Sequence, residues 1–301
     1  MATQKIEFSE ILSEGNKVFK SNSPHFLELS ALFAYPFVLF LLAFPVLQHL
    51  QIIPQFYSDE VSISWKHVIF FVLYAFTLLT LYICATATIT YSSYHVIFGQ
   101  PVKFVYAVKS MSKSFLRLFA TFFCALSIIF AGLIGVGLIV FGLIKGFECL
   151  GFQIEYSSKY FLVLEATLGY GLLYLCVNWC LAPVIVVVEK SWGLEPLRRS
   201  AYLVKGGRGV VLCLILYFGF IICLPAFGAW LLASVGGALT VASLLVHSAV
   251  LTLFLLNSLT ANSVLYMKCK ALHGEIVEKF AQEFVRLPLD EEDVPHYVSD
   301  V

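Results

Sequence analysis

Charge is what this sequence has least of. Only 13% of its 301 residues are charged, whereas 60% are hydrophobic and the mean hydropathy is +0.89. A soluble domain carries roughly 25% charged residues, so this composition excludes an ordinary water-soluble fold. Lys and Arg together number 19, as do Asp and Glu. This zero balance gives no support to a nucleic-acid-binding protein, whose footprint is strongly basic.

The motifs of catalysis are also lacking. The sequence contains no glycine-rich phosphate loop, H-E-x-x-H, G-x-S-x-G or C-x-x-C, and no paired-carboxylate site. The segments between the apolar stretches are too short to hold a catalytic domain. We therefore expect a protein that is not an enzyme and that has no cofactor or metal site. An intramembrane lipid enzyme ranks third among the hypotheses, because the sequence shows no nucleophile and base that could act as a pair.

Six apolar stretches are long enough to cross a bilayer. A hydrocarbon core of ~30 Å requires about 20 mostly apolar residues in a helix. The candidates are residues 27–47, 67–95, 115–144, 160–188, 210–232 and 237–266. The residues before the first stretch hold several charges and no apolar run, so no cleavable signal peptide is expected. The predicted organisation is a cytoplasmic segment at 1–26, a transmembrane domain at 27–268 and an acidic cytoplasmic tail at 269–301.

The positive charges are divided unequally between the two sides of these spans. One side receives 16 of the 19 Lys and Arg residues, and the other side receives only Lys66, Lys145 and Lys159. Cytoplasmic loops carry the excess of positive charge in multi-pass proteins. Both termini are therefore predicted to be cytoplasmic, in a protein of the plasma membrane or of the endomembranes (ER or Golgi).

The sequence repeats at intervals of about ninety residues, a period that indicates a repeated supersecondary unit. The segment V-F-K-S-N-S-P-H-F-L-E-L from Val18 corresponds to A-V-K-S-M-S-K-S-F-L-R-L from Ala107, and a third copy begins at Val204. The even-numbered spans also end alike, each at a glycine: Gly99, Gly193 and Gly274. We predict an all-α membrane protein of three parallel hairpin repeats, each preceded by an interfacial amphipathic helix.

The predicted interfacial helices are basic. Apolar side chains recur on one face at helical spacing, as at Phe8, Ile11 and Leu12, which predicts helices that lie at headgroup level. The candidate contacts with anionic lipid of the cytoplasmic leaflet are Lys103, Lys109, Lys113, Arg117, Arg198, Arg199, Lys205 and Arg208. The alternative is that these charges only fix the orientation of the spans.

A few polar residues lie inside the predicted spans, where an ionisable group is a functional hypothesis by default. Glu165 and His247 are candidates for a proton-sensitive pair, and the repeat alignment sets Asn178 opposite Asn257. Together they would suit the polar path of a small-solute transporter or channel. The alternative is that Glu165 reaches the headgroups, His247 bonds a nearby carbonyl and the amides join helices.

The segment 187–206 carries a resemblance. It reads V-V-E, then G, then L-R-R-S and L-V-K-G, directly before a span. This pattern resembles the membrane domain found ahead of some bacterial glycerophosphodiester phosphodiesterases, although their catalytic barrel is absent here. Over its whole length the chain is similar to an uncharacterised family of plant six-span transmembrane proteins. The resemblance implies a six-span fold in a plant membrane and no catalytic residues.

The sequence as a whole favours a non-enzymatic membrane protein. Its role would be that of a scaffold or adaptor in plasma or secretory membranes. The expected partners are anionic lipids and membrane or cytosolic proteins, with no nucleic acid. The small-solute transporter or channel is the alternative.

Overall fold

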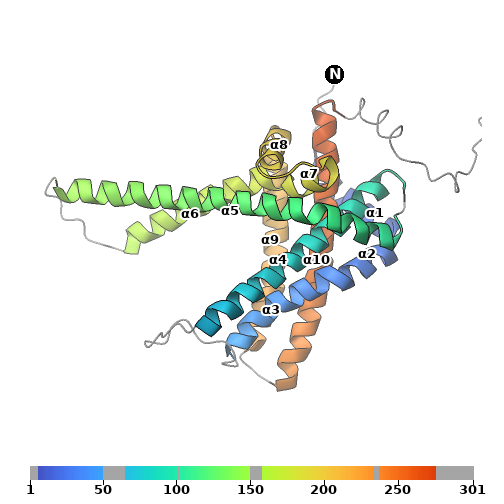
Figure 1. Ribbon diagram of the computed structural model, residues 1–301, viewed down its shortest axis with the longest axis horizontal. Coiled ribbons are helices and arrows are strands. Elements are labelled where there is room, and N and C mark those ends of the chain that lie inside the picture. The colour runs from blue at the N-terminus through green and yellow to red at the C-terminus, as the bar shows by residue number, and fades with distance from the viewer. Residues whose placement is uncertain (1–5, 50–64, 101, 150–157, 234–236, 276–301) are drawn as a thin grey trace, which may run out of the picture.

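The fold is described by a computed structural model, which places residues 6–49, 65–100, 102–149, 158–233 and 237–275 (Figure 1). Every regular element in these residues is a helix, as the sequence predicts. Six helical segments are long and apolar enough to cross a membrane, and they match the six predicted spans. These are Ser23–Phe44, Val68–Ile97, Phe104–Leu143, Glu165–Glu189, Arg208–Gly228 and Leu239–Leu272.

Two of the spans are assembled from several helical pieces. The first consists of α2 (Ser23–Leu29), the π-helix η1 (Ser30–Ala34) and α3 (Tyr35–His49), and it follows the separate helix α1 (Phe8–Ser21). The fourth consists of α6 (Ser158–Trp179) and α7 (Ala182–Glu189). Proline stands in the first turn of α2 and of α7, where its missing N–H costs no hydrogen bond. The remaining helices are α4 (Trp65–Ile97), α5 (Phe104–Cys149), α8 (Glu195–Leu203), α9 (Arg208–Ala233) and α10 (Gly237–Leu272).

Helices α4 and α10 end in the same way. After each helix a glycine, Gly99 or Gly274, adopts a left-handed conformation with φ of 72°. Both glycine N–H groups and the N–H groups that follow them bond back to the last turn in the Schellman pattern, with Gln100 donating to His95 and Glu275 to Lys270. Because roughly a third to a half of helices end in this way, the repeat relation between these two units stays a prediction.

The second predicted interfacial helix is not a separate element, which corrects the prediction for that unit. Helix α5 runs without a break from Phe104 to Cys149. Residues 104–130 contain neither proline nor glycine, so no residue in this stretch favours a break between the basic segment and the span. By contrast, α1 and α8 are separate helices: α1 packs mainly against α10, and α8 packs mainly against α6 and α7.

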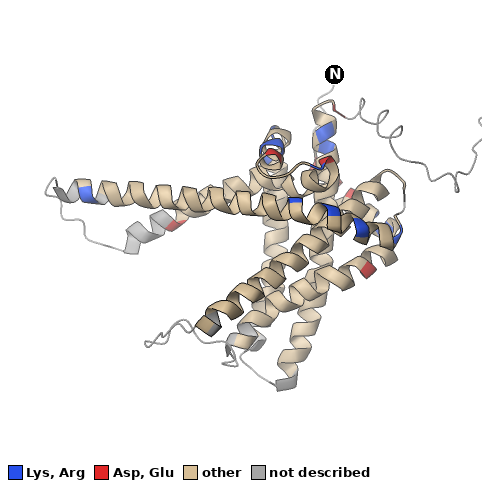
Figure 2. Cartoon of the chain, in the orientation of Figure 1, with Lys and Arg blue, Asp and Glu red and all other residues tan. Residues whose placement is uncertain are grey.

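The packed core lies at one end of the molecule. We call this the charged end: it contains α1 and α8, the last turns of α4, α7 and α10, and the first turns of α5 and α9 (Figure 2). Ile11, Leu181, Ile185 and Leu265 are fully buried there and belong to one cluster. The core therefore joins elements from the two ends of the chain.

A second region is much less covered by protein. Residues 127–149 of α5 and 158–173 of α6, here called the α5–α6 arm, extend away from the other helices (Figure 1). Leu138 is 66% exposed and Tyr170 is 74% exposed. Apolar side chains this open require a lipid or protein environment, consistent with a membrane span.

Candidate functional site

Helix α1 is packed against α10 by its apolar face. Ile11 and Gly15 are buried, and a Cβ atom on Gly15 would lie only 3.1 Å from the Cα atom of Ala261. The ring of Phe8 meets that of Tyr217 on α9, with 5.5 Å between centroids. Protein therefore covers much of the face that the sequence analysis assigned to lipid, which corrects that prediction for α1.

Lys268 fixes the polar side of α1 to α10. Its Nζ donates to Glu10 Oε1 at 2.7 Å and to Glu14 Oε1 at 2.8 Å. The two glutamates are four residues apart on α1, so both carboxylates lie on one helix face and reach the same ammonium group. An ammonium group has three N–H donors, and these bonds use two of them.

A second polar group, the Glu189 cluster, joins α7, α8 and α10. It consists of Glu189, Arg199, Tyr266, Lys270 and Glu275. The Tyr266 hydroxyl donates to Glu189 Oε1 at 2.8 Å and accepts from Lys270 Nζ at 3.1 Å. Glu189 also pairs with Arg199 and with Lys270, each at 3.5 Å, and Arg199 forms a further ion pair with Glu275.

The Glu189 cluster balances two carboxylates against two cations in a largely buried place. The Lys270 side chain is 9% exposed and that of Glu189 is 16% exposed. Burial alone would lower the pKa of Arg199, but the hydrogen bond to Glu275 and the charge of Glu189 outweigh this effect and raise it. The cluster therefore holds three separate helices in one arrangement, with every charge paired.

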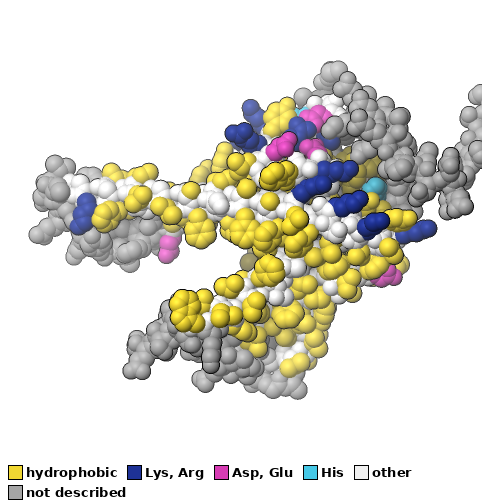
Figure 3. Space-filling view, in the orientation of Figure 1, with side chains coloured by type: hydrophobic (Ala, Val, Ile, Leu, Met, Phe, Trp, Pro, Cys, Tyr) yellow, Lys and Arg dark blue, Asp and Glu magenta, His cyan; other side chains and the backbone are white. Residues whose placement is uncertain are grey.

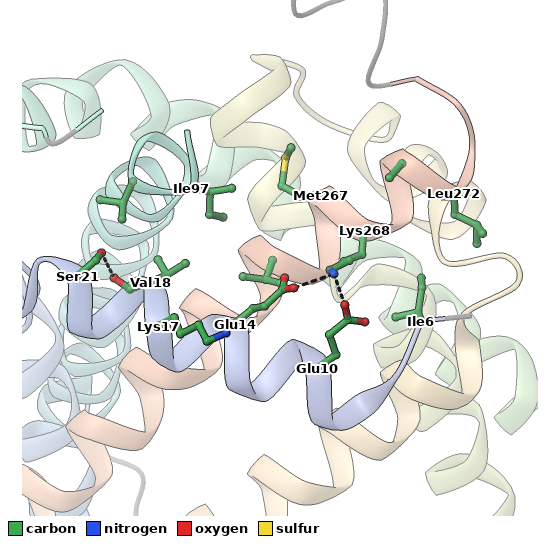
Figure 4. Close-up of a pocket in the computed structure, with 13 residues that line it drawn as sticks. Ile6, Glu10, Glu14, Lys17, Val18, Ser21, Ile97, Met267, Lys268 and Leu272 are labelled. Carbon is green, nitrogen blue, oxygen red and sulfur yellow. Dashed lines mark hydrogen bonds and ion pairs between the residues drawn. The ribbon is translucent and has the colours of Figure 1, made fainter. Parts of the chain in front are cut away.

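A cavity opens beside the Lys268 ion pairs. It has a volume of about 530 Å³ and lies between α1, the end of α4 and the end of α10 (Figure 4). Its polar lining comes from Glu10, Glu14, Lys17, Ser21 and Lys268. Its apolar lining consists of Ile6, Val18, Val96, Ile97, Val264, Met267, Ala271 and Leu272.

Most of the predicted lipid-binding cations are exposed in the structure, whereas Arg199 is paired with carboxylates. Lys103, Lys109, Lys113, Arg198 and Lys205 are exposed and form no ion pair with a described residue. Arg208 is also exposed and lies 5.8 Å from the ring centroid of Tyr174, while Arg117 is half-buried. Arg199 differs, because its guanidinium group is paired in the Glu189 cluster. Dark blue side chains gather over the start of α5 and around α8 in Figure 3.

The structure does not bring Glu165 and His247 together. His247 bonds the Ser243 carbonyl at 2.8 Å, and its Nε2 lies 3.1 Å from where a Cβ atom on Gly228 would stand. Glu165 is exposed on α6, which packs mainly against α8 and α9 and not against α10. The predicted proton-sensitive pair of Glu165 and His247 is therefore not formed.

The two asparagines are likewise separate. Asn178 is buried, its side-chain Nδ2 donates to the backbone carbonyl of Tyr174 at 2.7 Å, and its backbone carbonyl accepts from the Ser200 hydroxyl at 2.6 Å. Asn257 lies on α10, where its carbonyl accepts from Thr260. The backbone at position 178 thus joins α6 to α8, while the Oδ1 atom of the Asn178 side chain is buried and bonds no described residue.

A smaller cavity of about 200 Å³ lies among α4, α5, α7 and α8, next to Thr86 and Thr121. None of Glu165, His247, Asn178 and Asn257 lines either of these two cavities. Within the described ranges, no three His, Cys, Asp or Glu side chains are grouped to hold a metal ion. The polar chemistry that converges in this fold is the ion pairing at the charged end.

Sequence reasoning predicted the pairing in neither ion-pair group, and it assigned Arg199 of the Glu189 cluster to lipid. Glu189 and the pair Lys268 and Lys270 stand at the ends of spans, where the sequence analysis counted the lysines only as positive charge on one side. Acidic residues at the ends of the same spans, such as Glu189 and Glu275, could have indicated the pairing. A carboxylate that lies at the same end of the spans as several lysines is a candidate ion-pair partner.

Comparison with known proteins gives one match. No curated protein and no solved structure matches this chain. The sequence model of a family described as "Domain of unknown function (DUF8558)" matches residues 52–285. This range includes α4 to α10, and therefore both the Glu189 cluster and Lys268. Because the match extends over more than half of its length, the chain belongs to this DUF8558 family.

Proposed function

We propose that this protein is a non-enzymatic scaffold or adaptor in a plant plasma or secretory membrane. Its charged end faces the cytoplasm, and the exposed cations there bind anionic lipids or acidic surfaces of partner proteins. The plant setting rests on the resemblance of the sequence to plant six-span proteins. The cytoplasmic orientation is supported by the 16 of 19 Lys and Arg residues on one side of the spans.

The observation that supports this function is the separation between paired and unpaired cations. Lys268, Lys270 and Arg199 are engaged by carboxylates within the fold. The start of α5 and the α8–α9 region present cations that have no carboxylate partner among the described residues. Each such cation near an anionic leaflet contributes about 1 kcal/mol, so several together form a substantial site.

The test is lipid retention by a charge-neutralised variant. Six exposed cations would be changed to Gln in the full chain: Lys103, Lys109, Lys113, Arg198, Lys205 and Arg208. The proteins would be purified from membranes of known composition, and retained phosphatidylserine and phosphatidylglycerol quantified by mass spectrometry. We expect retention to fall at least tenfold.

The matched control is a single change at the far end of α5. Lys145→Gln removes an exposed cation from the other end of the same helix. It should leave anionic lipid retention unchanged. Equal retention by the parent protein and the six-site variant would contradict the proposed lipid-binding role.

A further inference from the structure

The cavity beside α1 differs in charge from the exposed basic surface. Two carboxylates, Glu10 and Glu14, and two ammonium groups, Lys17 and Lys268, contribute to its lining. The lining is therefore formally neutral. An anionic lipid headgroup placed there would meet both carboxylates, so the cavity favours a different ligand from the one that suits the exposed cations.

Each of these charged groups retains bonding capacity toward the cavity. The Glu10 and Glu14 carboxylates use only Oε1 on Lys268, and no described residue bonds either Oε2. Lys268 keeps one N–H donor, and Lys17 is exposed and pairs with no described residue. Figure 4 shows Glu10 and Glu14 both directed at Lys268, with Lys17 on the same stretch of α1.

The remaining lining is apolar and comes from the membrane helices. Val96 and Ile97 close the end of α4, and Val264 and Met267 lie on α10. The Glu10 and Glu14 side chains are 41% and 37% exposed, so the polar part is accessible from outside. A ligand that fits has a compact headgroup with one cation and one anion, joined to an apolar chain.

We propose that this cavity binds the phosphoethanolamine group of a membrane phospholipid. The primary ammonium of the ligand donates to the second oxygens of Glu10 and Glu14, while its phosphate accepts from Lys17 and Lys268. The start of an acyl chain packs against Val96, Ile97 and Met267. The proposal rests on the proposed function only in placing the charged end at headgroup level.

The chemistry also separates this headgroup from phosphocholine. A quaternary ammonium has no N–H group, so it cannot donate a hydrogen bond to the carboxylate oxygens. Phosphatidylglycerol has no cation at all. The cavity should therefore rank phosphatidylethanolamine above phosphatidylcholine and phosphatidylglycerol when all three carry the same acyl chains.

The experiment is a lipid competition on the full-length protein in detergent. Delipidated protein would be incubated with equimolar dioleoyl forms of the three lipids, washed on a column and assayed by mass spectrometry. The six-site basic-surface variant would be used as background, so that anionic lipid on that surface does not mask the cavity. We expect at least fivefold more phosphatidylethanolamine than either competitor.

Two variants test the assignment of the charges. The double variant Glu10→Gln and Glu14→Gln keeps oxygen acceptors for Lys268 but makes the cavity lining cationic. The ratio of bound phosphatidylethanolamine to bound phosphatidylglycerol should therefore fall at least tenfold. Lys17 is exposed and pairs with no described residue. Lys17→Gln should lower the amount of bound phosphatidylethanolamine without raising that of phosphatidylglycerol. The control with equal charge loss is Glu28→Gln with Glu195→Gln, both exposed and outside the cavity.

The outcomes separate this proposal from the function proposed above. Absence of an ethanolamine preference, or an equal ratio change in the Glu28 and Glu195 control, would overturn the cavity assignment while leaving the basic surface in place. A parallel incubation with an equimolar amount of soluble phosphoethanolamine tests the source of the group. Retention of the lipid is expected, because its acyl chain also packs in the cavity, whereas full displacement would overturn the assignment to a membrane lipid.

Discussion

The charged end and the α5–α6 arm both carry apolar side chains, but protein covers these side chains at the charged end and leaves them exposed on the arm. Leu265, on α10 at the charged end, is fully buried by protein, whereas Leu138 on the arm is 66% exposed. A Cβ atom on Gly15 would nearly touch the Ala261 backbone, while one on Gly135 of α5 would meet no atom within 4 Å. Protein covers the apolar side chains of the charged end. Those of the α5–α6 arm must be covered by lipid or by another protein.

This difference explains why the ion pairs lie where they do. At the charged end, α1, α7, α8 and α10 meet, and their apolar contacts bring side chains such as Glu189 and Lys270 close enough to pair. Among the described residues, no comparable set of helices meets at the arm. Side chains that interact across helices are therefore expected at the charged end, and substitutions there should cost more stability than substitutions on the arm.

The largest effect is expected for Glu189→Ala. The change leaves the largely buried ammonium of Lys270 without its carboxylate, and breaking a buried ion pair costs about 3–5 kcal/mol. The free energy of unfolding in detergent micelles should fall by this amount. Glu195→Ala, at an exposed acid of α8, is the matched control and should change the stability by less than about 0.5 kcal/mol.

A pair of leucine truncations contrasts the two regions directly. Leu265→Ala opens a cavity in the packed core and should lower the free energy of unfolding by about 2–5 kcal/mol. Leu138→Ala removes the same atoms from an exposed face of the arm and should cost less than about 0.5 kcal/mol. Similar losses for both variants would show that the arm is packed against protein in the folded state.

A pair of glycine substitutions makes the same comparison with an added methyl group. Gly15→Ala places a Cβ atom 3.1 Å from the Ala261 backbone, and overpacking of this kind costs about 1–3 kcal/mol. Gly135→Ala meets no neighbour and should stabilise α5 by about 0.5–1 kcal/mol through helix propensity. Thermal unfolding in one detergent would measure both; a stabilising Gly15→Ala would contradict the close packing of α1 on α10.

The six spans could be predicted from the sequence because the signal is local. Each apolar run has the length that a bilayer demands, and the prolines and glycines that mark helix starts and ends are neighbours of those runs. The continuity of α5 was missed because the serines and lysines at 103–114 resemble a separate surface helix. Nothing in that stretch breaks a helix, and the structure continues it.

The ion-pair groups could not be predicted in the same way. Glu10 and Lys268 are 258 positions apart, and only the packing of α1 on α10 brings them together. The predicted pair of Glu165 and His247 failed for a related reason. Both residues lie in apolar spans, and the sequence alone does not say that α6 packs mainly against α8 and α9.

The proposed function requires that the charged end faces the cytoplasm, and this orientation can be measured directly. Lys205→Cys is at an exposed position of the charged end, and Lys145→Cys is exposed at the far end of α5. A membrane-impermeant maleimide added to intact cells should label Lys145→Cys above the parent protein and leave Lys205→Cys unlabelled until the membrane is opened. Labelling of Lys205→Cys in intact cells, with Lys145→Cys protected, would contradict the account.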